Sequence, residues 1–444
     1  MLVGAGSQAF GMKTMTNLIW SLDVFDGATV CLHDVDEGEL KRTRGLAELA
    51  NRQLAEIPPD EEGVPHGQFK IEATTDRREA FENADFIVSS IEINRYPLWK
   101  EDYEVPVSLG STQIYGENGG PGGLFHACRV IPPVVEICQD VEDVCPDAWF
   151  FNYTNPMIRV CTAIQRATPK VKFCGLCHEF LGMVNRVNQM FKDRLGGGKK
   201  ERPFVENFHM TTAGLNHFAF LQELRDQETG EDLLPEIGPR LERHFAQKNP
   251  LMWFLFQKFG QVVYTDDSHS GEYVGWAREI STVRGYDWDR HQALDAKRRE
   301  DVTRILEGGA EFYWWMSLVN ERVVDIMKGL LTDDRGYREL AVNVGNDAGL
   351  IPGIPSDMVV EVPALVSKGG IRGERITTIP KGVLGLLRHE AAVSDLAVEA
   401  ALTGDRDVAL QALLLDGTVP TPEIAEKILK TMLERQKKYL PQFW

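Results

Sequence analysis

The sequence lacks several features that define whole classes of protein. It has no apolar run near the roughly 18 residues of a membrane-spanning helix, and it begins without the basic and apolar segments of a signal peptide. Its seven cysteines are few and odd in number, which disfavours a disulfide framework. A basic excess is also missing, because the net charge is −18. These absences predict a cytoplasmic protein with neither a membrane nor a nucleic-acid partner.

The composition is that of a folded globular protein, with 43% hydrophobic and 26% charged residues. A chain of 444 residues exceeds one ordinary hydrophobic core, so we expect two closely packed domains. Nearly continuous apolar runs over residues 85–90 and 148–153 are typical of buried parallel strands. We predict an N-terminal Rossmann-like, doubly wound α/β domain over residues 1–180. A mixed α/β domain over residues 181–444 follows, with a helix over residues 392–414.

A dinucleotide-binding fingerprint opens the chain. The run Gly-Ala-Gly-Ser-Gln-Ala, which starts at Gly4, matches G-x-G-x-x-A between a short apolar strand and a helical stretch over residues 11–22. Gly4 permits the tight turn, and Gly6 with Ser7 lets backbone N–H groups approach a pyrophosphate. Asp34 follows the next strand, where a ribose-binding carboxylate is expected. Because a carboxylate repels a 2′-phosphate, we predict NAD rather than NADP; a purely structural glycine turn is the alternative.

Two further segments follow predicted strands. The densest glycine cluster, residues 116–123, is either a flexible turn or a loop that brings the backbone close to a ligand. Asn155 ends another strand, and Pro156 restricts it to extended backbone. Since ligands of doubly wound sheets bind at the carboxyl ends of strands, we expect the Asn155 amide to face the crevice. A turn-forming Asn-Pro pair is the alternative.

A thiol and an imidazole form a candidate metal-binding pair. Cys177, His178 and Glu179 follow a strand-like run, and His217 lies about forty positions later in an apolar one. Cys174 and Cys177 make a CxxC, but no second such pair completes a zinc knuckle. A single histidine in an apolar run is commonly a core residue. The nearby cysteine favours the other interpretation, a site for a divalent metal.

A polar segment over residues 264–273 is the last candidate. It gathers ionisable and hydroxyl side chains around two small spacers, so it is either a solvated loop or the edge of a polar pocket. Tyr264 follows two valines and is expected to point inward.

Taken in order, these motifs resemble those of glycoside hydrolase family 4, the NAD- and divalent-metal-dependent glycosidases. The resemblance covers nearly the whole chain. It implies the fold of the lactate and malate dehydrogenases and a homodimer or homotetramer. Beyond the motifs above, it includes Gly214-Leu-Asn-His-Phe, Asp267-Ser-His-Ser-Gly-Glu-Tyr, Asn343-Val-Gly-Asn-Asp-Ala-Gly-Leu-Ile-Pro-Gly-Ile-Pro, Val360-Glu-Val-Pro and Glu399-Ala-Ala-Leu-Thr-Gly-Asp-Arg.

The resemblance also implies an uncommon glycosidase mechanism. Bound NAD takes hydride from C3 of the sugar, and the new ketone acidifies the proton on C2. A divalent metal, usually Mn²⁺, chelates the C2 and C3 oxygens and stabilises the developing charge. A base removes the C2 proton, the aglycone is eliminated, water adds, and the same NADH returns the hydride. The cycle consumes no net redox equivalents.

The roles of individual residues follow from the same resemblance. Cys177 and His217 match the metal ligands. Tyr264 is the candidate base, with Asp267 as the competing candidate, because a free tyrosine has a pKa near 10 and needs help from the metal. His178 occupies the position at which some relatives carry an aspartate that protonates the leaving group.

The resemblance also implies that the residues after the metal cysteine vary with the class of substrate. Relatives acting on 6-phosphosugars carry Cys-Asn or Cys-Asp, those acting on neutral α-glucosides and α-galactosides carry Cys-His-Ser, and Cys-His-Gly or Cys-His-Glu accompanies uronic acids. The Cys-His-Glu of this chain implies an α-galacturonidase or α-glucuronidase, with Asn155 and Glu179 at the substrate. A uronate needs a cationic clamp, for which we consider three side chains that are otherwise surface or structural residues, namely Arg95, Lys100 and Arg129.

Three other functions stay open. One is an α-glucosidase or α-galactosidase of the same family. A second is an NAD-dependent dehydrogenase of the lactate or malate type, which needs no metal thiolate. A third is a protein that binds NAD without catalysis. Loss of activity on chelation, with no accumulation of NADH, distinguishes the glycosidases from the other two.

Overall fold

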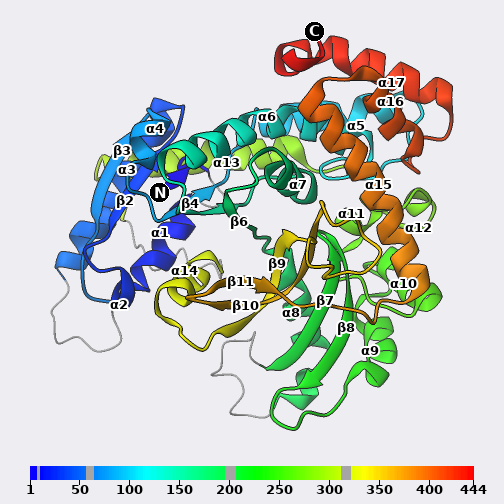
Figure 1. The fold of residues 1–444 in the computed structure, drawn as a ribbon, viewed down its shortest axis with the longest axis horizontal. Helices are drawn as coiled ribbons and strands as arrows, with labels where there is room; N and C mark the ends of the chain where they lie inside the picture. The colour runs from blue at the N-terminus through cyan, green and yellow to red at the C-terminus, as the bar shows by residue number, and fades with distance from the viewer. Residues whose placement is uncertain (8–10, 57–64, 196–206, 312–321) are drawn as a thin grey trace.

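The computed structural model describes residues 1–7, 11–56, 65–195, 207–311 and 322–444. Within these ranges the strands form one 11-stranded sheet in the order β3-β2-β1-β4-β5-β6-β9-β10-β7-β8, with β11 paired to β10 (Figure 1). The strands are β1 (Leu2–Val3), β2 (Thr29–His33), β3 (Lys70–Thr74), β4 (Phe86–Ser89), β5 (Trp149–Asn152), β6 (Lys172–Gly175), β7 (Phe208–Leu215), β8 (Phe218–Asp226), β9 (Tyr337–Gly345), β10 (Val359–Ser367) and β11 (Gly370–Gly373).

The first six strands are parallel and the others antiparallel. The parallel order 3-2-1-4-5-6 is that of the doubly wound dinucleotide-binding fold, so the predicted fold class is confirmed. Sequence analysis did not identify β3, whose alternating polar residues lack the apolar run of a buried strand. At the junction, β6 pairs antiparallel with β9 through Gly175 and Asn343.

The helices before the junction are the crossovers between parallel strands, and those after it surround the antiparallel strands or return to helices of the parallel half. They are α1 (Gly11–Ile19), α2 (Leu22–Phe25), α3 (Glu37–Ala55), α4 (Arg77–Phe81), α5 (Arg95–Ser108), α6 (Gly120–Val144), α7 (Met157–Ala167), α8 (Glu179–Met190), α9 (Ile237–Phe245), α10 (Pro250–Phe259), α11 (Asp267–Ser270), α12 (Ala277–Ile280), α13 (Trp288–Leu306), α14 (Val323–Thr332), α15 (Lys381–Thr403), α16 (Arg406–Leu415) and α17 (Pro422–Arg435).

The pleat of the parallel strands divides their apolar side chains between two cores. Val3 and Phe150 pack with α4, α6 and α7 on one face. Leu2 and Phe151, their chain neighbours, pack with α1, α3 and α14 on the other. Both faces of the parallel half are therefore covered, as its continuous apolar strands predict. A third core surrounds the β7–β8 hairpin and α8 to α10.

The prediction of a single helix over residues 392–414 is wrong. This segment forms α15 and α16, separated at Gly404, whose φ of +69° ends α15 in the left-handed region. A side chain at Gly404 would also collide with the backbone of Gln442, because its Cβ would lie 1.9 Å from the Gln442 carbonyl oxygen. The bend lets α15, α16 and α17 pack back along α6 (Figure 1).

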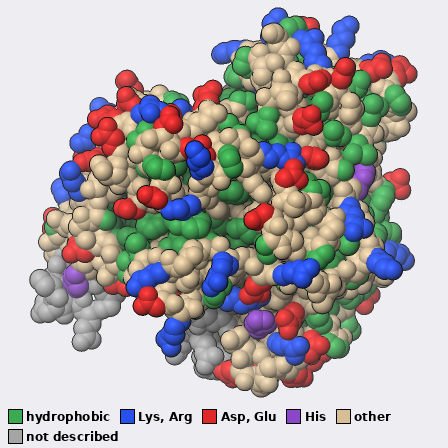
Figure 2. Space-filling view, in the orientation of Figure 1, with side chains coloured by type: hydrophobic (Ala, Val, Ile, Leu, Met, Phe, Trp, Pro, Cys, Tyr) green, Lys and Arg blue, Asp and Glu red, His purple; other side chains and the backbone are tan. Residues whose placement is uncertain are grey.

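The sheet therefore runs through both predicted domains, and α15 to α17 from the second pack on helices of the first. The boundary between residues 1–180 and 181–444 stays a prediction. Among the described residues, none of the helices has the length and apolar character needed to cross a bilayer. On the face shown in Figure 2, acidic and basic side chains are interspersed rather than gathered into a basic surface.

A buried ion pair fastens α17 to the N-terminal helices. Arg129 on α6 donates from Nη1 and Nη2 to the Asp102 carboxylate of α5, at 3.0 and 2.5 Å. Gln436, just after α17, bonds both partners, at 2.7 Å each. Both charged side chains are about 1% exposed, so neither can be rehydrated if its partner is removed.

We predict that Arg129→Met lowers the free energy of unfolding by about 3 kcal/mol, because it leaves the Asp102 carboxyl buried without its cation. Urea denaturation followed by circular dichroism measures the change. The matched control is Lys100→Met, whose partner Asp289 is 79% exposed, and this variant should unfold like the parent protein. Equal midpoints for the two variants would contradict the role given to the buried pair.

Candidate active site

The carboxyl ends of the parallel strands gather most of the predicted site residues at one edge of the sheet. β1 leads into Gly4, β5 into the segment of Asn155, and β6 into Cys177. β1 and β6 are three strand spacings apart in the sheet order, which is about 14 Å. A dinucleotide bound across the crevice at β1 thus extends toward the end of β6.

The glycine turn after β1 has the geometry that its sequence predicts. Gly4 has a φ of +73°, and a Cβ there would lie 2.8 Å from the Ser90 carbonyl oxygen. At Gly6 an added Cβ would lie 2.5 Å from that of Glu39. The Gly6 N–H donates to Asp34 Oδ2 at 2.9 Å, so the predicted ribose-binding acid lies against the turn. Gln8 and Ala9, the end of the fingerprint, lie outside the described residues.

The predicted metal-binding pair is brought together. Cys177 follows β6, His217 occupies the β7–β8 turn with a φ of +64°, and Cys177 Sγ lies 3.1 Å from His217 Nε2. With metal–sulfur and metal–nitrogen bonds of about 2.3 and 2.1 Å, atoms at that separation subtend about 90° at one ion. This angle suits neighbouring ligands of an octahedral cation. The described residues hold no cluster of three or more His, Cys, Asp or Glu side chains suited to a metal, so the protein would leave further coordination positions open.

The electrostatics of the pair also fit a cation. Burial, together with the neighbouring His269, lowers the pKa of His217 well below its usual value, which keeps the imidazole neutral as a ligand must be. Burial, and next the charge of Glu361, raise the pKa of the Cys177 thiol well above its usual value. A bound cation offsets that penalty, because a coordinating thiol is deprotonated by the metal.

Tyr264 lies directly beneath this pair. Its hydroxyl accepts the backbone N–H of His217 at 2.7 Å and the Asn216 amide at 3.3 Å, and it donates to Glu361 Oε2 at 3.4 Å. The side chain is fully buried. Burial, and next the charge of Glu361, raise the pKa of Tyr264 well above its usual value. The Tyr264 hydroxyl therefore holds the β7–β8 turn in place. The role of Tyr264 as the base stays a prediction.

The competing candidate, Asp267, is occupied elsewhere. Its two oxygens accept the N–H groups of Leu251 and Met252 at 3.0 Å each, in the first turn of α10. The adjacent Asp266 was not singled out from the sequence. Burial alone would raise its pKa, but hydrogen bonds from Ser268 and the charges of His269 and Arg186 outweigh burial and lower it. The pKa of Asp266 is thus shifted in the direction that favours its carboxylate form.

His178 and Glu179 lie at the start of α8, beside Cys177. The His178 side chain is 56% exposed, and its Nε2 lies 3.8 Å from Glu179 Oε1. Arg186 lies about two turns after Glu179 on α8. It donates to the Tyr264 carbonyl, and its buried Nε has no partner in the protein. This arginine, absent from the sequence predictions, is the one Lys or Arg side chain of α8.

His269 and Glu272 are also functional candidates that the sequence did not single out, although both lie in the polar segment 264–273. The ring centroids of His269 and His217 are 4.1 Å apart, and His269 Nδ1 lies 3.2 Å from Glu272 Oε1. Burial disfavours the charged imidazole, but the bond to Glu272 and the nearby carboxylates outweigh it and raise the pKa of His269 to about 9. A cationic ring therefore lies beside the predicted ligand, at a tilt of 31°.

The same Glu272 explains the glycine cluster over residues 116–123. Glu272 Oε2 accepts the N–H groups of Glu117, Asn118 and Gly119, at 2.6, 2.7 and 3.2 Å. A Cβ at Gly119 would lie 2.6 Å from the Glu272 carbonyl oxygen. At these three N–H groups, the loop backbone therefore binds the Glu272 side chain of the protein itself.

The predicted substrate contacts are only partly placed at the site. Asn155 precedes α7, and its buried Oδ1 has no partner in the protein. Arg95 donates to Glu92 at 3.1 Å and to Glu117 at 2.5 Å. Lys100 and Arg129 are committed to Asp289 and Asp102, as described above, so the structure contradicts a clamp made by either.

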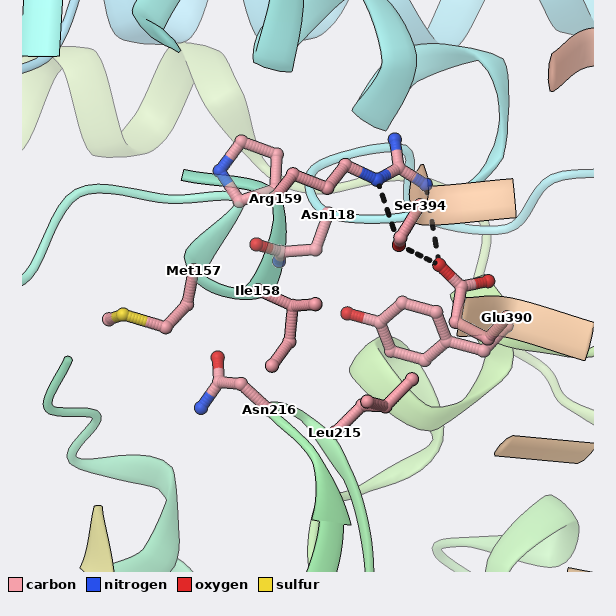
Figure 3. Close-up of a pocket in the computed structure, with 10 residues that line it drawn as sticks. Asn118, Met157, Ile158, Arg159, Leu215, Asn216, Glu390 and Ser394 are labelled. Atoms are coloured by element: carbon pink, nitrogen blue, oxygen red, sulfur yellow. Dashed lines mark hydrogen bonds and ion pairs between the residues drawn. The ribbon is translucent and has the colours of Figure 1, made fainter. Parts of the chain in front are cut away.

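A small enclosed cavity lies between this site and α15. Figure 3 shows Asn118, Ile158, Leu215 and Asn216 around it, with Arg159, Glu390 and Ser394 joined by hydrogen bonds at one side. Its volume is about 10 Å³, which is room for about one water molecule rather than a sugar ring.

Comparisons with known proteins agree with this arrangement. Residues 1–193 match the family 4 glycosyl hydrolases, and residues 212–419 match the family 4 glycosyl hydrolase C-terminal domain. An α-glucosidase from Erwinia rhapontici is 35% identical over 99% of this chain and 98% of its own length. An α-galacturonidase from Lachnoclostridium phytofermentans is 26% identical, over 100% and 96%.

Among solved structures, a 6-phospho-α-glucosidase from gut microorganisms, in complex with NAD and Mn²⁺, superposes with a TM-score of 0.79. It is 21% identical and covers 99% of this chain and 98% of its own. At that identity the likeness shows the fold.

We predict that Tyr264→Phe weakens the binding of a divalent cation by roughly 10-fold, because it removes the acceptor for the His217 N–H and loosens the turn that carries the ligand. Isothermal titration with Mn²⁺ measures the affinity. Tyr273→Phe, which removes a hydroxyl from a partly buried tyrosine of the same core, is the control and should bind Mn²⁺ like the parent. If Tyr264 acted only as a base, Tyr264→Phe would bind the cation normally.

Proposed function

Because the chain belongs to family 4 of the glycosyl hydrolases, we propose that it is an NAD- and divalent-metal-dependent glycosidase that cleaves an uncharged α-glucoside. The observation that carries the proposal is the 3.1 Å approach of Cys177 Sγ and His217 Nε2. The pair lies on the sheet edge that also bears the glycine turn and Asp34, so redox and Lewis-acid chemistry would share one crevice.

Two sets of side chains would hold the cofactors. Cys177 and His217 would bind a divalent cation such as Mn²⁺, which supplies Lewis acidity to neighbouring sugar oxygens. The turn at Gly4 and Gly6, with Ser7, would face the pyrophosphate of NAD, which supplies a reversible hydride acceptor, and Asp34 would accept ribose hydroxyls. Gly4 and Gly6 have no side chain that would block the approach of the pyrophosphate. A side chain at either position would also collide with Ser90 or Glu39.

The base is proposed to be a carboxylate. Tyr264 positions His217 through its backbone N–H, and Asp267 is committed to α10. That leaves Asp266, whose pKa is lowered by Ser268, His269 and Arg186, at the N-cap of α11 beside His269. We assign the removal of the C2 proton to Asp266, with Asp267 and Tyr264 as competing candidates. Asn155, whose Oδ1 has no protein partner, would accept a hydrogen bond from a sugar hydroxyl.

The charge balance around the pair favours a neutral sugar. The cations described near it already face carboxylates: Arg95 pairs with Glu92 and Glu117, His269 pairs with Glu272, and Arg186 faces Glu179 and Asp266. A uronate or phosphate needs a cation that is not already neutralised. The 35% identity with an α-glucosidase over nearly the full length supports the same choice.

A uronic-acid glycoside is the second candidate, because of one cation. Arg186 has a buried Nε without a protein partner, and Glu179 after His178 completes the Cys-His-Glu triplet. An arginine of this kind could receive a carboxylate from the substrate. A homodimer or homotetramer in the cytoplasm also remains part of the proposal, and sedimentation equilibrium measures the association state.

We predict that 4-nitrophenyl α-glucoside is cleaved in the presence of NAD, Mn²⁺ and a reductant, faster than the α-galacturonide and the 6-phospho-α-glucoside. Chelation with EDTA should abolish cleavage, and Mn²⁺ should restore it without accumulation of NADH. Deuterium at C2 should slow turnover. Cleavage of the uronide alone would select the second candidate, and steady production of NADH without sugar release would select a dehydrogenase.

We also predict different outcomes for the two adjacent acids. Asp266→Asn should lower kcat at least 100-fold and abolish exchange of the C2 proton with solvent, because general bases contribute about 10²- to 10⁴-fold. Asp267→Asn should keep exchange but lower thermal stability, since the capping charge at α10 is lost. Proton NMR in D₂O and thermal denaturation separate the two effects, and exchange that survives in Asp266→Asn would move the role to Asp267 or Tyr264.

A further inference from the structure

A single acid lies in the middle of the apolar strand β10. The strand reads Val-Val-Glu-Val-Pro-Ala-Leu-Val-Ser, and its Glu361 is 1% exposed. A carboxyl group buried in this way is unfavourable unless it receives several hydrogen bonds. No ion pair of Glu361 with a cation is found among the described residues, so its hydrogen bonds must account for its presence.

One oxygen of this carboxyl group receives three hydrogen bonds. Glu361 Oε2 accepts the Asn216 Nδ2–H at 2.6 Å, the Asn343 Nδ2–H at 3.1 Å and the Tyr264 hydroxyl at 3.4 Å. The other oxygen, Oε1, is buried without a partner in the protein. The three donors come from different parts of the sheet: the β7–β8 turn, β9, and the segment before α11.

Each of the three donors leads to a predicted metal ligand. Asn216 precedes His217 in the turn, and Tyr264 accepts the His217 backbone N–H at 2.7 Å. Asn343 also donates to the Gly175 carbonyl at 3.3 Å, two residues before Cys177. The two ligands belong to strands that do not pair with each other, since β9 and β10 lie between β6 and β7 in the sheet.

We propose that Glu361 is the positioning residue of the metal site, in which one carboxylate oxygen fixes the separation of Cys177 Sγ and His217 Nε2. The inference rests on the proposed function, because it takes these two side chains as ligands of a cation. Glu361 is neither a proposed ligand, nor the proposed base, nor a proposed cofactor contact, so the inference adds one residue to the site. Removing the acceptor releases three donors together, so both ligands lose their support.

The test compares two substitutions of the same residue. Glu361→Met keeps the length of the side chain and removes both oxygens, whereas Glu361→Gln keeps one acceptor oxygen for the three donors. Because supporting groups of this kind alter metal affinity roughly 10- to 100-fold, Glu361→Met should bind Mn²⁺ at least 10-fold more weakly. Glu361→Gln should stay within a few-fold of the parent. Isothermal titration gives both affinities.

Co²⁺ supplies a readout that a general loss of stability does not change. A cysteine bound to Co²⁺ produces a sulfur-to-cobalt absorption band in the near ultraviolet, and its position reports the geometry of the bond. The band should shift or weaken in Glu361→Met and be retained in Glu361→Gln. NAD binding, measured on the same samples, should be equal in all variants, because the glycine turn is on another strand.

The matched control is Glu339→Gln on the neighbouring strand β9. Glu339 is 2% exposed and pairs with Arg322, so the substitution also disturbs a buried acid, but it should leave the cobalt band unchanged. If Glu361→Met does not fold, Asn343→Ala removes one of the same three bonds and should still shift the band. An unshifted band with parental Mn²⁺ affinity, in whichever variant folds, overturns the inference. A parent protein without any sulfur-to-cobalt band would instead remove the proposed function.

Discussion

The antiparallel pairing of β6 with β9, through Gly175 and Asn343, is the constraint on which the rest of the structure depends. It joins a doubly wound parallel sheet to an antiparallel one without a break, so the β7–β8 turn lies beside the carboxyl end of β6. Gly175 is required there, because an added Cβ would lie 2.7 Å from Cys161 Sγ and 2.9 Å from Asn343 Cβ. The thiol after β6 and the imidazole of the turn meet as a consequence of this junction.

Around that meeting point the protein keeps an unusual density of buried charge. Glu272 anchors the glycine loop through three backbone N–H groups and holds the cationic His269 against His217. Burial raises the pKa of Glu361 to about 7 despite its hydrogen bonds. Such groups are costly for stability, and they persist where a site must be held rigid before substrate arrives. Among these carboxylates, Glu361 accepts hydrogen bonds from the amides of Asn216 and Asn343, and Asp266 faces the cations of His269 and Arg186.

Much of this could be predicted from the sequence, because the signals are local. The glycine turn and the apolar parallel strands each depend on a few consecutive residues, and both are found in the fold, with Asp34 against the turn after the next strand. The pairing of Cys177 with His217 also came from residue chemistry. Tyr264 and Asp267 were chosen from one polar segment, but their hydrogen bonds run to His217 and to α10, which no spacing reveals. Lys100 and Arg129 pair with Asp289 and Asp102 instead. The sequence does not reveal either pair, because Asp289 is 189 residues from Lys100 and Asp102 is on α5 rather than α6.

The sequence by itself determined the family, the parallel half of the sheet except β3, and the kinds of side chain available for metal and dinucleotide binding, since these follow from periodicity and from motifs of adjacent residues. Only the tertiary structure decided which side chains share an environment. Glu361, Asn216 and Asn343 are far apart along the chain, and His269 differs from other histidines in a polar run only by its neighbours. Charge state, hydrogen bonding and ligand separation are properties of the assembled space, because each depends on what burial brings within a few ångströms.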